Sequence, residues 1–243
     1  SEEFAHQSAE DSAARFACAE NHIVYRTLLA DTQTAVGAMI KLAEGHSYHC
    51  LLESVEGGEI RGRYSIIGLK PDLIWRCSGN NAEINRQAET DLSAFKPDEH
   101  PPLTSLRTLM KEGEMPNTAP LPPMASGLFG YLGYDMIRHV EKVPDSNPNT
   151  LDVFDTILMR PSVIAIFDRL KDSITLAVPI RPADWQTASA AWADAQSRLK
   201  DAEERLHAPI PHTFEPSPNR DKIIPENNVS KKRFFEMVRS ARN

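Results

Sequence analysis

The stretch LLESVEGGEIRGRYSIIGLKPD, residues 51–72, joins two strand-like segments through a loop rich in Gly and Glu. The apolar run at 51–52 ends at Glu53 and Ser54, and the second segment begins near Arg63. Two such segments joined by a loop that contains Gly predict an antiparallel strand pair. A carboxylate, a hydroxyl and a guanidinium therefore meet at the end of this pair, where a sheet would otherwise close its apolar core.

The polar residues of this stretch allow two interpretations. Glu53 and Ser54 lie across the loop from Arg63, Tyr64 and Ser65. A carboxylate beside a hydroxyl and backbone N–H groups can hold the ammonium and the carboxylate of an amino-acid ligand. The alternative is a salt bridge between Glu53 and Arg63 that only closes a turn. The residues by themselves leave both interpretations open.

The composition is that of an ordinary globular protein. With 243 residues, of which 41% are hydrophobic, the chain can bury a sizeable core. Its formal net charge of -7 argues against general nucleic-acid binding, which needs clustered positive charge. Three widely spaced cysteines indicate neither a disulfide framework nor a zinc site. Neither a secretory signal nor a membrane-spanning run is expected. We therefore expect a cytoplasmic protein whose partners are small molecules or proteins.

The order of apolar runs and turn signals predicts an α+β fold with a mixed, largely antiparallel sheet and flanking helices. The expected strands lie at 23–29, 48–54, 63–69, 73–77, 82–85, 156–167 and 173–178. A helix after Asp31 and Thr32 is expected to bury Val36, Met39, Ile40 and Ala43. A long helix after Pro182 is expected to carry Trp185, Ala188, Trp192, Ala195 and Leu199 on its core face. Alternation of apolar residues at 163–167 predicts a strand buried on both faces.

Three glycines, Gly127, Gly130 and Gly133, recur at a spacing of three residues among large apolar side chains. This GxxGxxG spacing is neither the dinucleotide fingerprint nor a P-loop. We predict instead a strand whose backbone passes close to something bulky.

Nothing in the chain has the spacing of a catalytic or metal site. His46, His49 and Cys50 are close in sequence, but neighbouring residues of a strand point to opposite faces. GxSxG and HExxH motifs are missing from the sequence. We therefore predict no catalytic residue and no metal ligand within these 243 residues.

The predicted organisation has four parts. Residues 1–22 form a flexible lead-in, 23–206 one domain, 207–228 a Pro-rich linker and 229–243 a helix capped by Ser230. The apolar stripe of this helix reaches the last residues without a Gly or Pro stop. We expect the chain to be the N-terminal part of a longer protein.

Four segments, in the same order, resemble anthranilate synthase component I, the large subunit of a chorismate-utilising enzyme. They are LLESVEGGEIRGRYSIIGLKPD at 51–72, SGLFGYLGYDMIRHVEKVP at 126–144, FDTILMRPSVIAIFDRLKDSITL at 154–176 and NVSKKRFFEMVRSA at 228–241. The resemblance implies the N-terminal domain of that fold. It also implies that Glu53 and Ser54 form part of an allosteric pocket for the feedback inhibitor tryptophan, with Arg63, Tyr64 or Ser65 as the opposite wall.

The resemblance places the catalytic region of the whole protein after residue 243. There, glutamates would bind Mg²⁺, and chorismate would be aminated with ammonia from a glutamine amidotransferase subunit, component II, and lose pyruvate to give anthranilate. The whole protein would then be a lyase in a hetero-oligomer, and this fragment by itself would be inactive. Two alternatives stay open: aminodeoxychorismate synthase component I, and a free-standing amino-acid-binding module.

Overall fold

The computed structural model describes residues 7–53, 62–116, 118, 120–144, 152–211 and 227–242. Ser54, one of the predicted site residues, lies outside these ranges. The chain divides into two compact units, Ser1–Pro211 and His212–Asn243, and each is described by itself.

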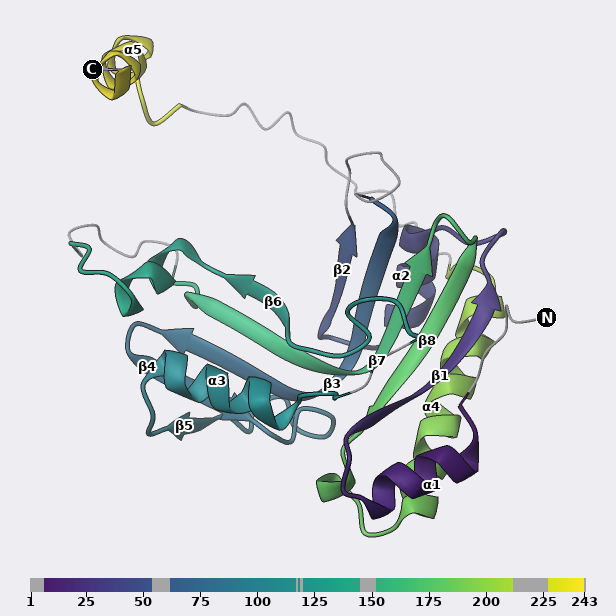
Figure 1. Cartoon of the computed structure of the whole chain (residues 1–243). Helices are drawn as coiled ribbons and strands as arrows, with labels where there is room; N and C mark the ends of the chain where they lie inside the picture. The colour runs from purple at the N-terminus through teal and green to yellow at the C-terminus, as the bar shows by residue number, and fades with distance from the viewer. Residues whose placement is uncertain are drawn as a thin grey trace. The chain divides into compact units, whose positions relative to one another are not determined.

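The first unit contains one antiparallel sheet and its flanking helices (Figure 1). Its elements are α1 (Ala9–Ala17), β1 (His22–Leu29), α2 (Ala35–Ala43), β2 (His49–Glu53), β3 (Tyr64–Ser78), β4 (Asn81–Asn85), β5 (Lys96–Asp98), α3 (Pro102–Glu112), β6 (Phe129–Leu132), the 3-10 helix η1 (Tyr134–His139), β7 (Thr156–Asp168), β8 (Ser173–Ile180), the 3-10 helix η2 (Pro182–Asp184) and α4 (Ala188–His207). The eight strands follow the order β1-β8-β7-β3-β4-β5, while β2 pairs with β3 and β6 pairs with β7. The predicted fold class is confirmed.

Two long strands, β3 and β7, run through the whole sheet (Figure 1). The first half of β3 pairs with β2, and its second half pairs with β4. Likewise, the second half of β7 pairs with β8 and its first half with β6. The sheet therefore consists of two groups of strands that have β3 and β7 in common.

The expected strands 63–69 and 73–77 are in fact one strand, β3, of 15 residues. Pro71 suggested a break between them, because proline cannot donate to a strand ladder. In the structure Pro71 lies opposite Pro161 of β7, where neither residue has an N–H group to pair, and the register shifts between Pro71 and Leu73. At this interruption of the ladder, the carbonyl oxygen of Lys70 accepts a hydrogen bond from the side chain of Ser162 at 2.5 Å.

Helices α2 and α4 cover one face of the strands β1, β8, β7 and β3 and bury an aliphatic core against them. Thr34, rather than Asp31 or Thr32, caps α2 by accepting a hydrogen bond from the backbone N–H of Gly37 at 3.0 Å. The predicted face of α2 is only partly right: Met39 and Ala43 pack against the core, but Val36 and Ile40 are exposed, and the buried residues are Ala35, Ala38 and Leu42. This helix is apolar almost all round, so its periodicity does not select a face.

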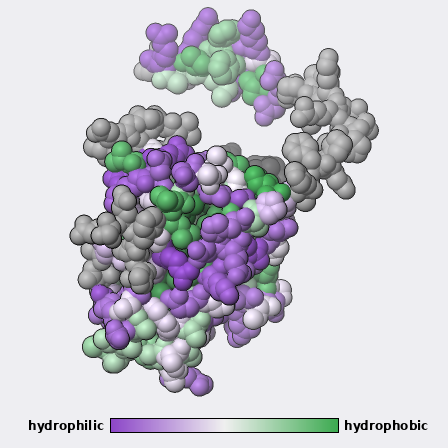
Figure 2. Space-filling view, turned by 90° about the vertical axis from the view of Figure 1, so that its right-hand side faces the viewer, coloured by the Kyte–Doolittle hydropathy of each residue, from purple (hydrophilic) through white to green (hydrophobic). Residues whose placement is uncertain are grey.

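Helix α4 buries a stripe of small and aliphatic residues, Ala191, Ala195, Leu199, Ala202 and Leu206. Ala195 and Leu199 were predicted to be buried, but Trp185 precedes the helix, and both Trp185 and Trp192 pack at the margin of the core. The outer side of α4 carries Lys200 and Glu204, which are exposed. Figure 2 shows that hydrophilic residues cover most of this side of the molecule and that hydrophobic surface gathers in smaller patches.

Within the segment 1–22, which was expected to be a flexible lead-in, the structure places the capped helix α1. The Oγ atom of Ser12, a buried residue, lies 2.8 Å from Nε2 of His22, which is also buried. This hydrogen bond ties α1 to the beginning of β1.

Strand β6 approaches β7 very closely, and its glycines make this possible. A Cβ atom on Gly130 would overlap the carbonyl oxygen of Ile157, and one on Gly133 would overlap that of Asp155. Gly130 also has a φ of +154°, which disfavours any side chain. The predicted close backbone passage is confirmed for these two residues.

The described part of the second unit is the helix α5 (Lys231–Arg242). The predicted cap is confirmed, because Oγ of Ser230 accepts a hydrogen bond from the backbone N–H of Arg233 at 3.3 Å. Over the described parts of both units, we find no helix with the length and apolar character needed to cross a membrane.

Candidate binding site at the end of strands β2 and β3

Glu53 and Ser65 lie opposite each other in the β2–β3 ladder. The hydroxyl of Ser65, a fully buried residue, donates to Oε1 of Glu53 at 3.3 Å. The antiparallel return that follows from the sequence therefore does bring a carboxylate and a hydroxyl together. The hydroxyl is that of Ser65, because Ser54 lies outside the described residues.

Arg169 completes this polar cluster and was not predicted as part of it. Its Nη2 atom lies 2.9 Å from Oε1 of Glu53 and 3.1 Å from Oγ of Ser65. Arg169 belongs to the turn between β7 and β8, more than 100 residues away from Ser65 in the sequence. The only sequence signal was the charged turn at 168–172, which predicted a connection and not a contact with Glu53.

Arg63 has a different partner from the one that the sequence suggested. Its Nε and Nη2 atoms donate to the two carboxylate oxygens of Asp168 at 2.8 and 2.6 Å. Glu53 pairs with Arg169 instead, so the expected Glu53–Arg63 salt bridge is replaced among the described residues by two neighbouring pairs. Asp168 lies opposite Tyr64 in the β3–β7 ladder, which sequence spacing could not reveal.

The Arg63–Asp168 pair is partly removed from water. The side chain of Asp168 is 6% exposed, whereas that of Arg63 is 25% exposed. Burial raises the pKa of Asp168, but hydrogen bonds from Arg63 and from the backbone of Leu170 and Lys171 outweigh it and hold the pKa below its ordinary value. The guanidinium of Arg63 also lies 4.9 Å from the ring centroid of Tyr64, a cation–π contact.

Four of the five predicted residues, Glu53, Arg63, Tyr64 and Ser65, therefore lie at one end of β2 and β3. Glu53 and Ser65 lie opposite each other on one face of the sheet, whereas Tyr64, the neighbour of Ser65 in β3, lies on the other face, opposite Asp168 in the ladder. The carboxylate and the hydroxyl of the first face can hold the ammonium group of a small ligand.

The histidines near β2 do not form a metal centre. Nδ1 of His49 lies 2.8 Å from the carbonyl oxygen of His46, and burial together with nearby Lys70 lowers the pKa of His46. Within the described ranges, no three His, Cys, Asp or Glu side chains converge to hold a metal ion.

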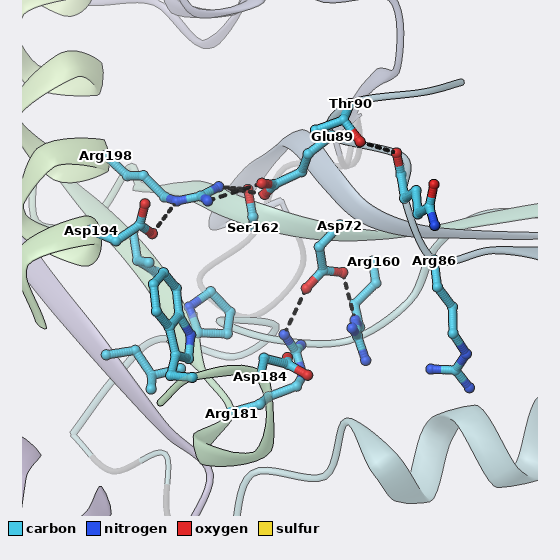
Figure 3. Close-up of a pocket in the computed structure, with 15 residues that line it drawn as sticks. Asp72, Arg86, Glu89, Thr90, Arg160, Ser162, Arg181, Asp184, Asp194 and Arg198 are labelled. Atoms are coloured by element: carbon cyan, nitrogen blue, oxygen red, sulfur yellow. Dashed lines mark hydrogen bonds and ion pairs between the residues drawn. The ribbon is translucent and has the colours of Figure 1, made fainter. Parts of the chain in front are cut away.

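A second polar region, missed at the sequence level, lines a hollow of about 450 Å³ beside η2 and α4 (Figure 3). Asp72 lies between Arg160 and Arg181 and accepts a hydrogen bond from each, at 2.6 and 3.0 Å. Nearby, Arg198 donates to both carboxylate oxygens of Glu89, at 2.6 and 3.1 Å. These charged residues lie far apart in the sequence, in separate strands and helices. No local motif or spacing therefore predicts that they come together.

The chain was also compared with known proteins, and no family model matches it. An anthranilate synthase component 1 from Cereibacter sphaeroides is 51% identical over 180 residues, which are 74% of this chain and 36% of that relative. An anthranilate synthase component 1 from Thermus thermophilus is 31% identical over 220 residues, which are 89% of this chain and 42% of the relative. This chain therefore spans well under half the length of these curated relatives.

Among solved structures, the crystal structure of anthranilate synthase component I from Streptococcus pneumoniae TIGR4 matches with a TM-score of 0.57. The match covers 88% of this chain and 44% of that one at 20% sequence identity, so it bears on the fold. The sequence relatives and the fold lead to the same family. The chain is a homologue of the N-terminal part of anthranilate synthase component I.

Proposed function

We propose that this chain is the regulatory portion of an anthranilate synthase component I and that it contributes one wall of a pocket for the feedback inhibitor tryptophan. The observation that carries the proposal is the meeting of Glu53 and Ser65 at the end of β2 and β3, where Arg169 donates to both. The carboxylate of Glu53 would take the ammonium group of tryptophan. Ser54 would add its hydroxyl to the same wall.

The proposal extends to the whole protein. There, chorismate and ammonia, delivered from glutamine by a component II subunit, would give anthranilate and pyruvate. Mg²⁺, bound outside this chain, would hold the carboxylates of the substrate and stabilise developing charge. The whole protein would act as a hetero-oligomer. Its place would be the cytoplasm, because widely spaced free cysteines are typical of a reducing compartment.

The decisive experiment follows anthranilate fluorescence with chorismate, ammonia and Mg²⁺, using both the 243-residue chain and the complete subunit. We expect turnover by the complete subunit and none by the chain. Robust turnover by the chain would contradict the assignment of catalysis to the remaining part. Identification of the product separates anthranilate from the aminodeoxychorismate of the related enzyme. A reading frame that stops after Asn243 would instead support a free-standing binding module.

The pocket itself is tested by calorimetry with tryptophan on the complete subunit. Ser54→Phe should abolish binding, because the ring would fill the space beside Glu53. Ser189→Phe is the matched control, since Ser189 is exposed at the beginning of α4, outside the proposed wall. Unchanged tryptophan affinity in Ser54→Phe would remove Ser54 from the site.

A further inference from the structure

Arg181, the residue that follows β8, carries hydrogen-bond donors that the rest of the described chain leaves unused. Its side chain is only 6% exposed, and its Nη1 atom donates to Oδ2 of Asp72 at 3.0 Å. Its Nε and Nη2 atoms are buried, and no hydrogen-bond partner for them is found in the residues that the structure describes. Buried N–H groups of a charged side chain are costly without acceptors, so these two atoms call for an explanation.

Arg181 also shares its nearest carboxylate with a second buried arginine. Arg160, whose side chain is 10% exposed, donates from Nε to the other oxygen of Asp72 at 2.6 Å (Figure 3). Two buried guanidinium groups thus share one carboxylate. Asp184 and Glu112 act on Arg181 at longer range. These two carboxylates are not hydrogen-bonded to Arg181, so its Nε and Nη2 atoms keep no acceptor among the described residues.

The unused donors of Arg181 form a complete binding edge. Nε and Nη2 lie on the same side of the planar guanidinium group, where two parallel hydrogen bonds can reach the two oxygens of one carboxylate. The same protein already uses this edge elsewhere, because Nε and Nη2 of Arg63 hold Asp168 in that way. In Arg181 the corresponding edge has no acceptor among the residues that the structure describes.

Arg160 and Arg181 line a second hollow, of about 530 Å³, between α3 and the segment that leads into β6. The remaining walls are mainly apolar and include Leu106, Leu109, Met110, Leu128 and Leu158, while the exposed Glu114 is the one acidic side chain among the described residues of the lining. Its volume lies in the range of small-molecule sites, roughly 300–1,000 Å³, which combine apolar walls with a few placed polar groups. An apolar body with an anionic end fits this arrangement.

We propose that this hollow binds a small organic anion with an apolar body, whose two oxygens are held by Nε and Nη2 of Arg181. Either a carboxylate or a phosphate ester has the required pair of oxygens. Glu53 and the other residues of the proposed tryptophan wall do not line the hollow, so this inference stands independently of the proposed function.

The test is a titration of the ¹⁵N-labelled 243-residue chain with benzoate, phenyl phosphate and, as the neutral probe, benzyl alcohol. The Nε–H signal of Arg181, assigned by its loss in Arg181→Met, should shift with at least one of the two anions and stay unchanged with benzyl alcohol. A response to benzoate only, or to phenyl phosphate only, supports the site and identifies its anion. No shift with either anion, or an equal response to benzyl alcohol, overturns it.

Four variants make the test specific. Arg181→Met should weaken anion binding at least tenfold, whereas Lys200→Met should leave it unchanged, because Lys200 is exposed on α4 and does not line this hollow. Met110 is exposed in α3 at the wall of the hollow, so Met110→Glu should repel the anion and Met110→Gln should not. The Met110 pair decides the question even if Arg181→Met does not fold, and equal binding by Met110→Glu and Met110→Gln would count against the site.

Thermal stability distinguishes a ligand site from a structural role. If the free edge of Arg181 exists for a ligand, Arg181→Met removes two unsatisfied donors and should keep or raise the Tm of the free chain, while Arg160 still holds Asp72. The anion that binds should then raise the Tm of the unsubstituted chain and leave that of Arg181→Met unchanged. A large loss of Tm in Arg181→Met, combined with no anion effect on the unsubstituted chain, would show that Arg181 serves the fold only.

Discussion

The hydroxyl of Ser65 and the carboxylate of Glu53 meet across neighbouring strands, with 3.3 Å between Oγ and Oε1, and Arg169 donates to both. If this carboxylate holds the ammonium of tryptophan, Glu53→Gln in the complete subunit should raise the tryptophan concentration for half inhibition about tenfold or more. A hydrogen bond to a charged group contributes about 1.5–3 kcal/mol. Inhibition of anthranilate formation measures the effect.

The control for this prediction is Glu83→Gln. Glu83 lies on β4, well outside the proposed wall, and its carboxylate is paired with Arg76 of β3. Glu83→Gln should leave inhibition as it is. Equal inhibition curves for Glu53→Gln and the unsubstituted subunit would exclude Glu53 from the pocket.

Acid should weaken the fold partly through Asp168, whose pKa is lowered in the folded state. A lowered carboxyl pKa stabilises the folded state above the pKa of the unfolded chain, about 3.9 for Asp. This contribution is lost as the pH falls through the lower, folded pKa. Below about pH 4, stability should therefore fall less steeply in Asp168→Asn than in the unsubstituted chain, while Asp168→Asn should be less stable at pH 7. Urea unfolding at several pH values measures both, and Asp135→Asn, an exposed change in η1, is the control.

Gly130→Ala should destabilise the chain by about 3 kcal/mol or more, a loss in the upper part of the range for single substitutions. The new Cβ would overlap the carbonyl oxygen of Ile157, and the φ of +154° adds strain. Gly45→Ala separates the two causes, because Gly45 also has a positive φ of +77° but nothing lies within 4 Å of the added atom. Gly45→Ala should cost only about 1–2 kcal/mol. Similar urea midpoints for the two variants would mean that the contact with β7 does not matter.

Much of the fold could be predicted from local patterns, because the sheet depends on them. The alternation at 163–167 is a good example: Ile164 and Ile166 enter one core while Val163 and Ala165 enter the other. The pairing of Glu53 with Ser65 likewise follows from two strands joined by one loop. Both patterns are local, so one sequence is enough to read them.

The parts that could not be predicted depend on long-range packing. Asp72, Arg160 and Arg181 come from different strands and strand ends, and the two arginines lie 88 and 109 positions after Asp72 in the sequence. Nothing in the neighbourhood of any one of them marks it as part of a cluster. The same holds for Arg169, whose sequence position predicted a turn but not its contact with Glu53.

Cys77 should resist alkylation in the native chain. Burial, with a contribution from Asp155, raises its pKa to about 11, and the thiolate is the reactive form. At pH 8 this pKa leaves on the order of one thiol in a thousand ionised. Exposed Cys18 should therefore react first with iodoacetamide, as mass spectrometry of each cysteine over time can follow. Equal rates for Cys18 and Cys77 would contradict the buried position of Cys77.

The sharing of β3 and β7 by both groups of strands has a consequence for how the molecule opens. A strand of 15 residues extends over roughly 45 Å, and its two ends belong to different neighbours, β2 at one end and β4 at the other. The two groups contain successive halves of one ladder, that of β3 with β7. Backbone amides on both sides of Pro71 should therefore exchange their hydrogens with solvent in a single concerted event, so that the end of β3 near Glu53 and the end near Cys77 protect each other.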